Sequence, residues 1–368
     1  MNTITLEIRP RLRSLNAYIS LKESIDNSRL QVRLGENDIK IEIQGKLYSL
    51  PLANIHLLPS SLSSLRITDK WISFRIQTEP NYLYGKFETE IIKNDEINYN
   101  YMNLANELQL PPKNKNCQLI CARCENRITK IVNFQRVLPL PSSGCDPQEW
   151  FCHKHGKDEP FSMDPKESDL FYSSNYCLFN TNVFEDRSKL LNSSNSLVQC
   201  NRCFAVIGSA KENNMKSLKI WNCCINYKII DDDSVMKIIS SPLSDFLTTF
   251  KYTSDYTIGE KILLEAEEAH CTHHIILKTM EKKLHIQKTD QVNLTQQSID
   301  LESSFVVKVF YKYGESKSTI KNNDPDVEFS ELPLSSFISG MEALMSSTAR
   351  FPPAYRKAED YYIGYLPL

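Results

Sequence analysis

Two pairs of cysteines are the residues of this sequence whose types and spacing best suit metal chemistry. Two residues separate Cys121 from Cys124, and two separate Cys200 from Cys203. This spacing lets both thiolates of one tight turn face the same ion, and two such turns complete the tetrahedral four-sulfur shell of structural zinc. The sequence therefore predicts one structural zinc site with these four cysteines as ligands.

The segment between the two pairs is too long for a compact zinc finger. It contains the 75 residues from Glu125 to Gln199, so a shared ion has to join two hairpin tips of a larger β-rich module. Disulfides and unrelated buried thiols are the alternatives. The first residues show no apolar segment typical of a secretory signal, which makes disulfides the weaker interpretation.

A second group of potential metal ligands lies between the two pairs. Its members are Cys145, Cys152, His153 and His155. The side chains have suitable donor atoms, but the spacing of known zinc sites is missing. We therefore favour the alternative that Trp150, Phe151 and Cys152 anchor a loop on the core while the histidines face solvent.

One cysteine among histidines is a weak candidate for catalysis. Cys271 is close in sequence to His270, His273 and His274. A nearby imidazolium lowers the pKa of a thiol and makes it a better nucleophile. Such a group also arises by chance, and its cysteine is then inert. The sequence leaves both interpretations open.

The composition limits the class of protein. A chain of 368 residues with 41% hydrophobic content has room for two or three domains with real cores. The 43 Lys and Arg against 45 Asp and Glu give 43 − 45 = −2, so we expect no direct nucleic-acid binding. No run approaches the roughly 18 apolar residues of a membrane span. We expect a soluble, intracellular protein without a membrane partner.

The apolar pattern predicts an α+β protein rich in β structure, beginning with an antiparallel β domain over residues 1–112. Apolar and polar residues alternate at 30–34 and 39–43, with turn-forming residues between them. The alternation is less regular at 71–76. Helical spacing at 101–110 ends at Pro111-Pro112, where we place the first boundary.

The middle region, residues 113–230, is predicted to be the zinc-stapled β module. Its segment 134–141 has the pattern of a short strand that Pro139 and Pro141 convert to extended, unpaired chain. Cys223 and Cys224 lie in a strand-like run. Because neighbouring side chains of a strand face opposite ways, we expect these two to pack in the core and not to share an ion.

The C-terminal region, residues 231–368, is predicted to be an α+β domain. Helical spacing occurs at 243–250, and residues 262–269 are helix-prone, whereas 305–311 alternate like a strand. A last helix is expected over 334–349, with Ser335 or Ser336 as its cap. Its apolar stripe, Phe337, Ile338, Met341, Leu344 and Met345, could bind a partner, although we expect core packing.

The order of these features resembles one protein family. The features are the β-rich start, the first C-x-x-C, residues 136–141 (Arg-Val-Leu-Pro-Leu-Pro), residues 149–153 (Glu-Trp-Phe-Cys-His), the second C-x-x-C and the C-terminal segments 351–356 and 362–366. They resemble the HECT-like proteins that bind ubiquitin-conjugating enzymes, over nearly the whole chain. The abundance of Asn, Ser, Ile and Lys suits a yeast member.

The resemblance implies two activities. One is ubiquitin ligation, or docking of a ubiquitin-loaded conjugating enzyme. The other is association with the metallo-β-lactamase-type endonuclease that cuts pre-mRNA before polyadenylation, which would place the protein in the nucleus and the cytoplasm. HECT ligases take ubiquitin as a thioester on a cysteine close to the C-terminus. This sequence has no cysteine after Cys271, so residues 272–368 supply no such nucleophile.

Two classes of function therefore stay open. A binding protein would hold the endonuclease and recruit a conjugating enzyme alongside. A ubiquitin-protein ligase would use another cysteine, such as Cys271. We rank binding first. A zinc hydrolase is the weakest hypothesis, because four sulfur ligands leave no position for water.

The aromatic C-terminal segments are the predicted contact with the endonuclease. Tyr355 and Arg356 are of the residue types that contribute most to protein interfaces. The alternative is that these aromatic residues close the C-terminal core.

Overall fold

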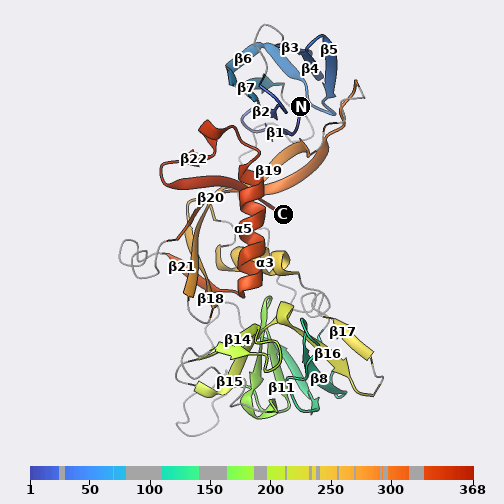
Figure 1. The fold of residues 1–368 in the computed structure, drawn as a ribbon, viewed down its shortest axis with the longest axis vertical. Helices are drawn as coiled ribbons and strands as arrows, with labels where there is room; N and C mark the ends of the chain where they lie inside the picture. The colour runs from blue at the N-terminus through green and yellow to red at the C-terminus, as the bar shows by residue number, and fades with distance from the viewer. Residues whose placement is uncertain are drawn as a thin grey trace.

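The computed structural model describes most of the chain. The described ranges are 1–24, 30–68, 70–79, 110–140, 164–185, 197–211, 214–231, 234–237, 241–254, 257–268, 271–290, 292, 297–314 and 327–368. They form several mostly antiparallel sheets and two α-helices, which confirms the β-rich α+β class (Figure 1). The helix expected at 101–110 falls outside them, apart from Leu110. Within these ranges no helix is long and apolar enough to cross a membrane.

The largest sheet combines both ends of the chain. Its ten strands are β1 (Ile4–Arg9), β2 (Ser14–Ser20), β6 (Leu57–Thr68), β7 (Trp71–Thr78), β18 (Lys261–Glu268), β19 (Cys271–Thr289), β20 (Glu302–Tyr313), β21 (Glu328–Glu331), β22 (Lys357–Ala358) and β23 (Tyr361–Pro367). The order is β22-β23-β20-β19-β1-β2-β7-β6, with β18 also paired to β19 and β21 paired to β18. The N-terminal and C-terminal regions thus share one sheet, a connection that the sequence did not predict.

Strand β19 makes this connection because it is long enough to have different neighbours at its two ends. Its first residues pair with β18, from Cys271 opposite Glu268 onward. Its last residues pair with β1, from His285 opposite Ile8 to Thr289 opposite Ile4. The pairing of β19 with β20 shifts register between these two parts. In Figure 1, β19 accordingly extends from the central part of the molecule toward the N-terminal strands.

The predicted N-terminal meander is present. It consists of β3 (Leu30–Leu34), β4 (Asp38–Ile43) and β5 (Lys46–Pro51), which form a three-stranded antiparallel sheet. Ile39 and Ile41 are fully buried in one core with Ile4 and Leu6 of β1. The alternation seen in the sequence therefore has the expected cause, one buried face against the large sheet.

The middle region contains two further sheets around one core. One has the order β10 (Arg136–Pro139), β11 (Asp169–Tyr172), β12 (Tyr176–Asn180), β15 (Asn214–Trp221), β14 (Val206–Lys211) and β13 (Leu197–Gln199). The other has the order β17 (Ser234–Lys237), β16 (Ile225–Ile229), β8 (Asn116–Cys121) and β9 (Val132–Asn133). Phe134, Phe179 and Tyr227 are fully buried between them.

Two sequence-based expectations about strands were wrong. Residues 136–139 are paired, because β10 lies parallel to β11 at the edge of the sheet, where Pro139 ends the strand without breaking a ladder. Residues 261–268 are strand β18, not a helix. Leu264 packs into the core under the helices, while Leu263 packs on the opposite face. A strand buried on both faces has a continuous apolar run, which periodicity cannot distinguish from a helix.

The two helices, α3 (Pro242–Ser254) and α5 (Leu334–Thr348), were predicted and pack against each other. A Cβ at Gly340 of α5 would lie 2.3 Å from the ring of Phe246, so glycine permits this close approach. One expectation about α5 fails, and another holds only in part, because Phe337 and Leu344 of its stripe are buried. Its N-cap is Pro333 without a side-chain hydrogen bond, so neither Ser335 nor Ser336 is the cap. Its stripe is only partly buried, since Ile338 and Met345 are 46% and 60% exposed.

A buried carboxylate stabilises the contact between the N-terminal and C-terminal strands. Glu7 of β1 is fully buried. It accepts hydrogen bonds from Lys308 Nζ of β20 at 2.5 Å and Tyr365 Oη of β23 at 2.7 Å. Arg9 lies 2.7 Å from its other oxygen and also binds Glu281. Burial alone would raise the pKa of Glu7, but Lys308 and Arg9 outweigh it and hold the pKa at about 2.

The substitution Glu7→Gln should destabilise the protein and change how its stability depends on pH. Removing one partner of a buried ion pair costs about 3–5 kcal/mol, because Lys308 is left buried without its counter-charge. The folded-state pKa of about 2 lies below the ordinary value of 4.5. The carboxylate therefore stabilises the fold above pH 4.5, and this contribution disappears as the pH falls toward 2.

Urea unfolding at pH 7, 4.5 and 3 measures both effects. The unfolding free energy of the wild type should fall more steeply below pH 4.5 than that of Glu7→Gln. Glu42→Gln is the matched control, because it removes a more exposed ion pair with Arg33 and should cost at most about 1 kcal/mol. Parallel pH profiles for the wild type and Glu7→Gln would contradict the role given to Glu7.

Candidate metal centre

The two cysteine pairs lie on turns with the same backbone geometry. The first turn follows β8, and the second follows β13. In each turn, the N–H of the first cysteine donates to the carbonyl five residues further on. Cys121 donates to Asn126, and Cys200 donates to Ala205. In each, the N–H four residues on donates back to the carbonyl of that cysteine. The residues at this fourth position, Glu125 and Phe204, both have positive φ, 57° and 56°.

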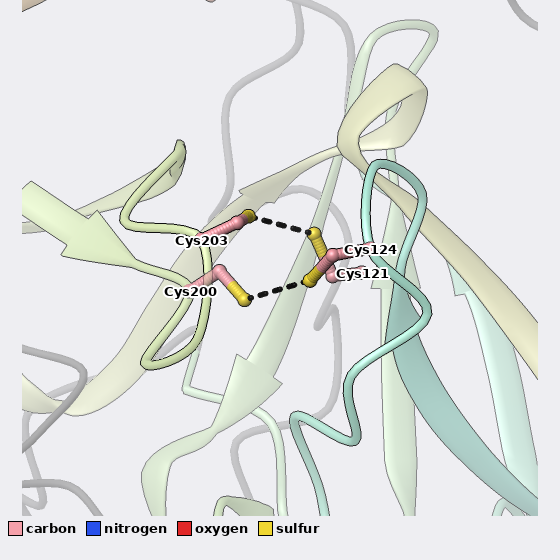
Figure 2. Close-up of side chains that lie close together, drawn as sticks. All are labelled: Cys121, Cys124, Cys200 and Cys203. Carbon is pink, nitrogen blue, oxygen red and sulfur yellow. Dashed lines mark hydrogen bonds between the residues drawn. The ribbon is translucent and has the colours of Figure 1, made fainter.

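The four sulfurs converge from these two turns (Figure 2). Cys121 Sγ lies 3.8 Å from Cys203 Sγ, and Cys124 Sγ lies 3.6 Å from Cys200 Sγ. All four lie within 4.8 Å of one another. An ion bound to sulfur at about 2.3 Å in a tetrahedron separates its ligands by about 3.8 Å. A disulfide needs about 2.05 Å, so the cluster has the dimensions of a metal site and not of two disulfides.

The thiols differ in their surroundings. Cys121 and Cys200 are buried in the middle core, whereas Cys124 and Cys203 are half-buried. Burial raises the pKa of the Cys121 thiol. Burial opposes ionisation of Cys203 too, but the Ala205 N–H and the neighbouring thiols lower its pKa to about 7. A divalent cation would hold all four as thiolates.

Four sulfur ligands close the coordination shell, so the site is suited to a structural role. The first pair ends a strand of the four-stranded sheet, and the second follows a strand of the six-stranded sheet. A metal ion at this position would join the two sheets of the middle region. The spacing alone predicted that these four sulfurs meet, because each C-x-x-C pair is itself a local turn.

The other cysteines of the middle region belong to the core or its border. Cys117 and Cys177 are fully buried, and burial raises the pKa of both to about 12. Cys223 and Cys224 are half-buried and belong to a short 3₁₀ turn, Asn222–Cys224, so the predicted strand begins only at Ile225. The second ligand group, Cys145, Cys152, His153 and His155, lies outside the described residues.

Cys271 is the one exposed cysteine among the nine that the structure describes. It begins β19, and its Sγ lies 3.3 Å from Nε2 of His273. Slight desolvation and the nearby Glu268 carboxylate raise the pKa of this thiol. His274 does not join them, because its Nε2 lies 2.7 Å from Glu265. His270 is outside the described residues.

Tyr355 and Arg356 lie where the C-terminal segment meets the N-terminal strands. The ring of Tyr355 packs 6.0 Å from that of Tyr18 in β2. Arg356 Nε donates to the Phe351 carbonyl at 2.8 Å, and its guanidinium lies 5.9 Å from the ring of Trp71 in β7. Both residues thus have structural contacts, and their role in partner binding stays a prediction.

Two comparisons of sequence extend over nearly the whole chain. A family model described as HECT-like ubiquitin-conjugating enzyme (E2)-binding matches residues 7–363. An E3 ubiquitin-protein ligase of Homo sapiens is 23% identical over 417 residues, covering 99% of this chain and 98% of the relative. Among solved structures, the nuclear movement protein from E. cuniculi GB-M1 covers 21% of this chain and 88% of its own length. Its identity of 18% and TM-score of 0.18 carry no argument about this fold.

Loss of one sulfur ligand should unfold the middle region. The free energy of metal binding to a closed site contributes directly to the free energy of folding. In zinc-finger peptides this contribution is about 10–16 kcal/mol. Cys200→Ser should therefore reduce both bound metal and the Tm, and a chelator should lower the Tm of the wild type. Cys223→Ser is the control, since this thiol lies outside the cluster. An unchanged Tm for Cys200→Ser would contradict the metal centre.

Proposed function

The chain belongs to the HECT-like family of ubiquitin-conjugating enzyme (E2)-binding proteins, and we propose that it works chiefly by holding such an enzyme. The family predicted from the sequence is thereby confirmed. The observation that carries the proposal is the family match over residues 7–363, which includes the N-terminal strands, the cysteine cluster and the C-terminal helix. We therefore propose E2 binding for the chain as a whole and not for one of its regions.

Binding without a covalent relay is supported by where the cysteines lie. No cysteine follows Cys271 in the sequence, so the C-terminal strands and α5 have no thiol to accept ubiquitin. The other eight described cysteines are buried or half-buried, four of them in the metal cluster. A transfer between two large proteins needs an accessible thiol, and Cys271 alone meets this condition among the described cysteines.

The alternative is a ubiquitin-protein ligase that uses Cys271. It is supported by the name of the human relative, which is that of an E3 ubiquitin-protein ligase, and by the imidazole of His273 beside an exposed thiol. The two functions differ in a covalent intermediate. A binding protein leaves ubiquitin on the conjugating enzyme, whereas a relay ligase carries it for a time as a thioester.

The identity of the ion is a second part of the proposal. Four cysteine ligands at tetrahedral spacing suit zinc, which has no redox chemistry and accepts a closed four-sulfur shell in structural sites. The ion would hold the middle region together so that it can present a surface to the conjugating enzyme. It would have no role in ubiquitin chemistry.

A finer proposal is that the protein also binds the pre-mRNA cleavage endonuclease, in the nucleus and the cytoplasm. Its support is the resemblance in sequence, with Tyr355 and Arg356 as the predicted contact. These residues touch the N-terminal strands, so a test has to separate binding from stability. Tyr355→Ala should reduce co-elution with the purified endonuclease more than it lowers the Tm. If co-elution falls only as far as the lowered Tm explains, Tyr355 has a structural role and no direct role in binding.

The test of E2 binding is a pull-down with purified conjugating enzymes charged with ubiquitin. The wild type and Cys271→Ser should retain the same enzyme equally well, and neither should carry ubiquitin on a non-reducing gel. A reductant-sensitive ubiquitin adduct that Cys271→Ser abolishes would establish the ligase alternative. Failure to retain any conjugating enzyme from a full panel would contradict the proposed function.

Elemental analysis of freshly purified, unchelated protein tests the identity of the ion. We expect at least one equivalent of zinc in the wild type. We expect Cys124→Ser to lose about one equivalent, because it removes one of four ligands. Cys117→Ala removes a buried thiol outside the cluster and is expected to keep the zinc of the wild type. Less than half an equivalent in the wild type would contradict the assignment.

A further inference from the structure

The hairpin of β18 and β19 brings three potential metal ligands to one face at its tip. Glu268 lies directly opposite Cys271, and Ala266 lies opposite His273. Side chains that are opposite each other, or two residues apart on one strand, project from the same face of a sheet. Glu268, Cys271 and His273 therefore point the same way, whereas His274 projects from the other face.

The donor atoms of these residues have the spacing of one face of a coordination tetrahedron. Cys271 Sγ lies 3.3 Å from His273 Nε2 and 3.7 Å from Glu268 Oε2. The remaining distance, from His273 Nε2 to Glu268 Oε2, is 3.9 Å. Zinc bound to sulfur, nitrogen and oxygen at its usual distances separates the three donors by about 3.4–3.6 Å. Small side-chain rotations would bring the present distances to these values.

The imidazole of His273 is already held in a suitable orientation. Its Nδ1 lies 3.1 Å from the hydroxyl of Tyr313, and its ring stacks on that of Tyr313 with centroids 6.4 Å apart. Phe337 of α5 packs on it at 5.8 Å. A histidine that ligates a metal through one nitrogen usually has its other nitrogen hydrogen-bonded, which fixes the tautomer and the ring. Tyr313 provides this contact and leaves Nε2 directed at Cys271 and Glu268.

We infer that Glu268, Cys271 and His273 form a second metal site, for a divalent first-row ion such as zinc, with a fourth position open to solvent. A carboxylate, a thiolate and a neutral imidazole together neutralise a divalent cation. Binding replaces the proton of the Cys271 thiol with the ion and releases this proton to water. Cys271 is exposed, and Glu268 is 52% exposed in its side chain, so an ion can enter directly.

This site differs in kind from the four-cysteine cluster. The cluster is closed and partly buried, and its turns come from two sheets, whereas the hairpin site has three protein ligands, of which Glu268 and Cys271 are exposed and His273 is half-buried. Three ligands and one exchangeable position are typical of zinc sites that bind water or another donor. The inference does not depend on the proposed E2 binding. It gives Cys271 a role that competes with that of a ubiquitin acceptor, because a thiolate bound to an ion is not free to form a thioester.

Titration of the full chain with Co²⁺ tests the site. Protein loaded with one equivalent of zinc should bind one further equivalent of Co²⁺ and show absorption of a tetrahedral ion with a thiolate ligand. Cys271→Ser and His273→Gln should lose this absorption. Tyr313→Phe should keep it with affinity about 10-fold weaker, the usual effect of removing a contact to a ligand. Cys271 is exposed, so Cys271→Ser should keep the Tm of the wild type.

Two matched controls separate this site from other thiols and imidazoles. Cys223→Ser removes a thiol outside both groups, and His285→Gln removes an imidazole at the other end of β19. Both should bind Co²⁺ like the wild type. Absence of a further equivalent in the wild type, or a thiolate–Co²⁺ absorption that persists in Cys271→Ser, would overturn the inference. The second result would assign the ion to another cysteine of the chain.

Discussion

The pairing of β1 with β19 around the buried carboxylate of Glu7 is the constraint on which the arrangement of the chain depends. A charge without a partner cannot be buried at an acceptable cost, so Glu7 requires Lys308 of β20 and Arg9 beside it. These contacts place β1 against strands formed near the other end of the sequence. The same β19 carries the hairpin with Cys271 at its other end, and β20 carries Tyr313. The hairpin of β18 and β19 is therefore part of the same sheet that Glu7 stabilises.

The middle region is held together by a different kind of constraint. Its two sheets share an apolar core, and the four cysteines meet at a border of that core. Two polar contacts connect the middle region to the C-terminal region. Asn175 donates to Thr249 of α3 at 2.7 Å, and Lys219 of β15 binds Glu331 of β21 at 3.2 Å. The C-terminal region thus lies between the N-terminal strands and the middle region with its four-cysteine cluster (Figure 1).

This arrangement suits a protein that holds partners. The family match extends over all three parts, and the described thiols, apart from that of Cys271, are buried or half-buried, four of them in the cysteine cluster. The side chains of Ile338 and Met345 on α5, in contrast, are apolar and exposed. The face of α5 opposite the sheet is therefore not needed for the core.

The sequence by itself determined the local features of this protein. The two C-x-x-C turns, the alternation in residues 30–43 and the helical spacing at 243–250 and 334–348 each depend on neighbours within a few residues, so their patterns could be interpreted directly. Tertiary structure decided the rest. Strand β18 has an apolar run that fits a helix as well, and only burial on both of its faces makes it a strand. The pairing of β1 with β19, and the opposition of Glu268 and Cys271, depend on strand register. Register is set by hydrogen bonds and packing between distant segments, which no local spacing contains.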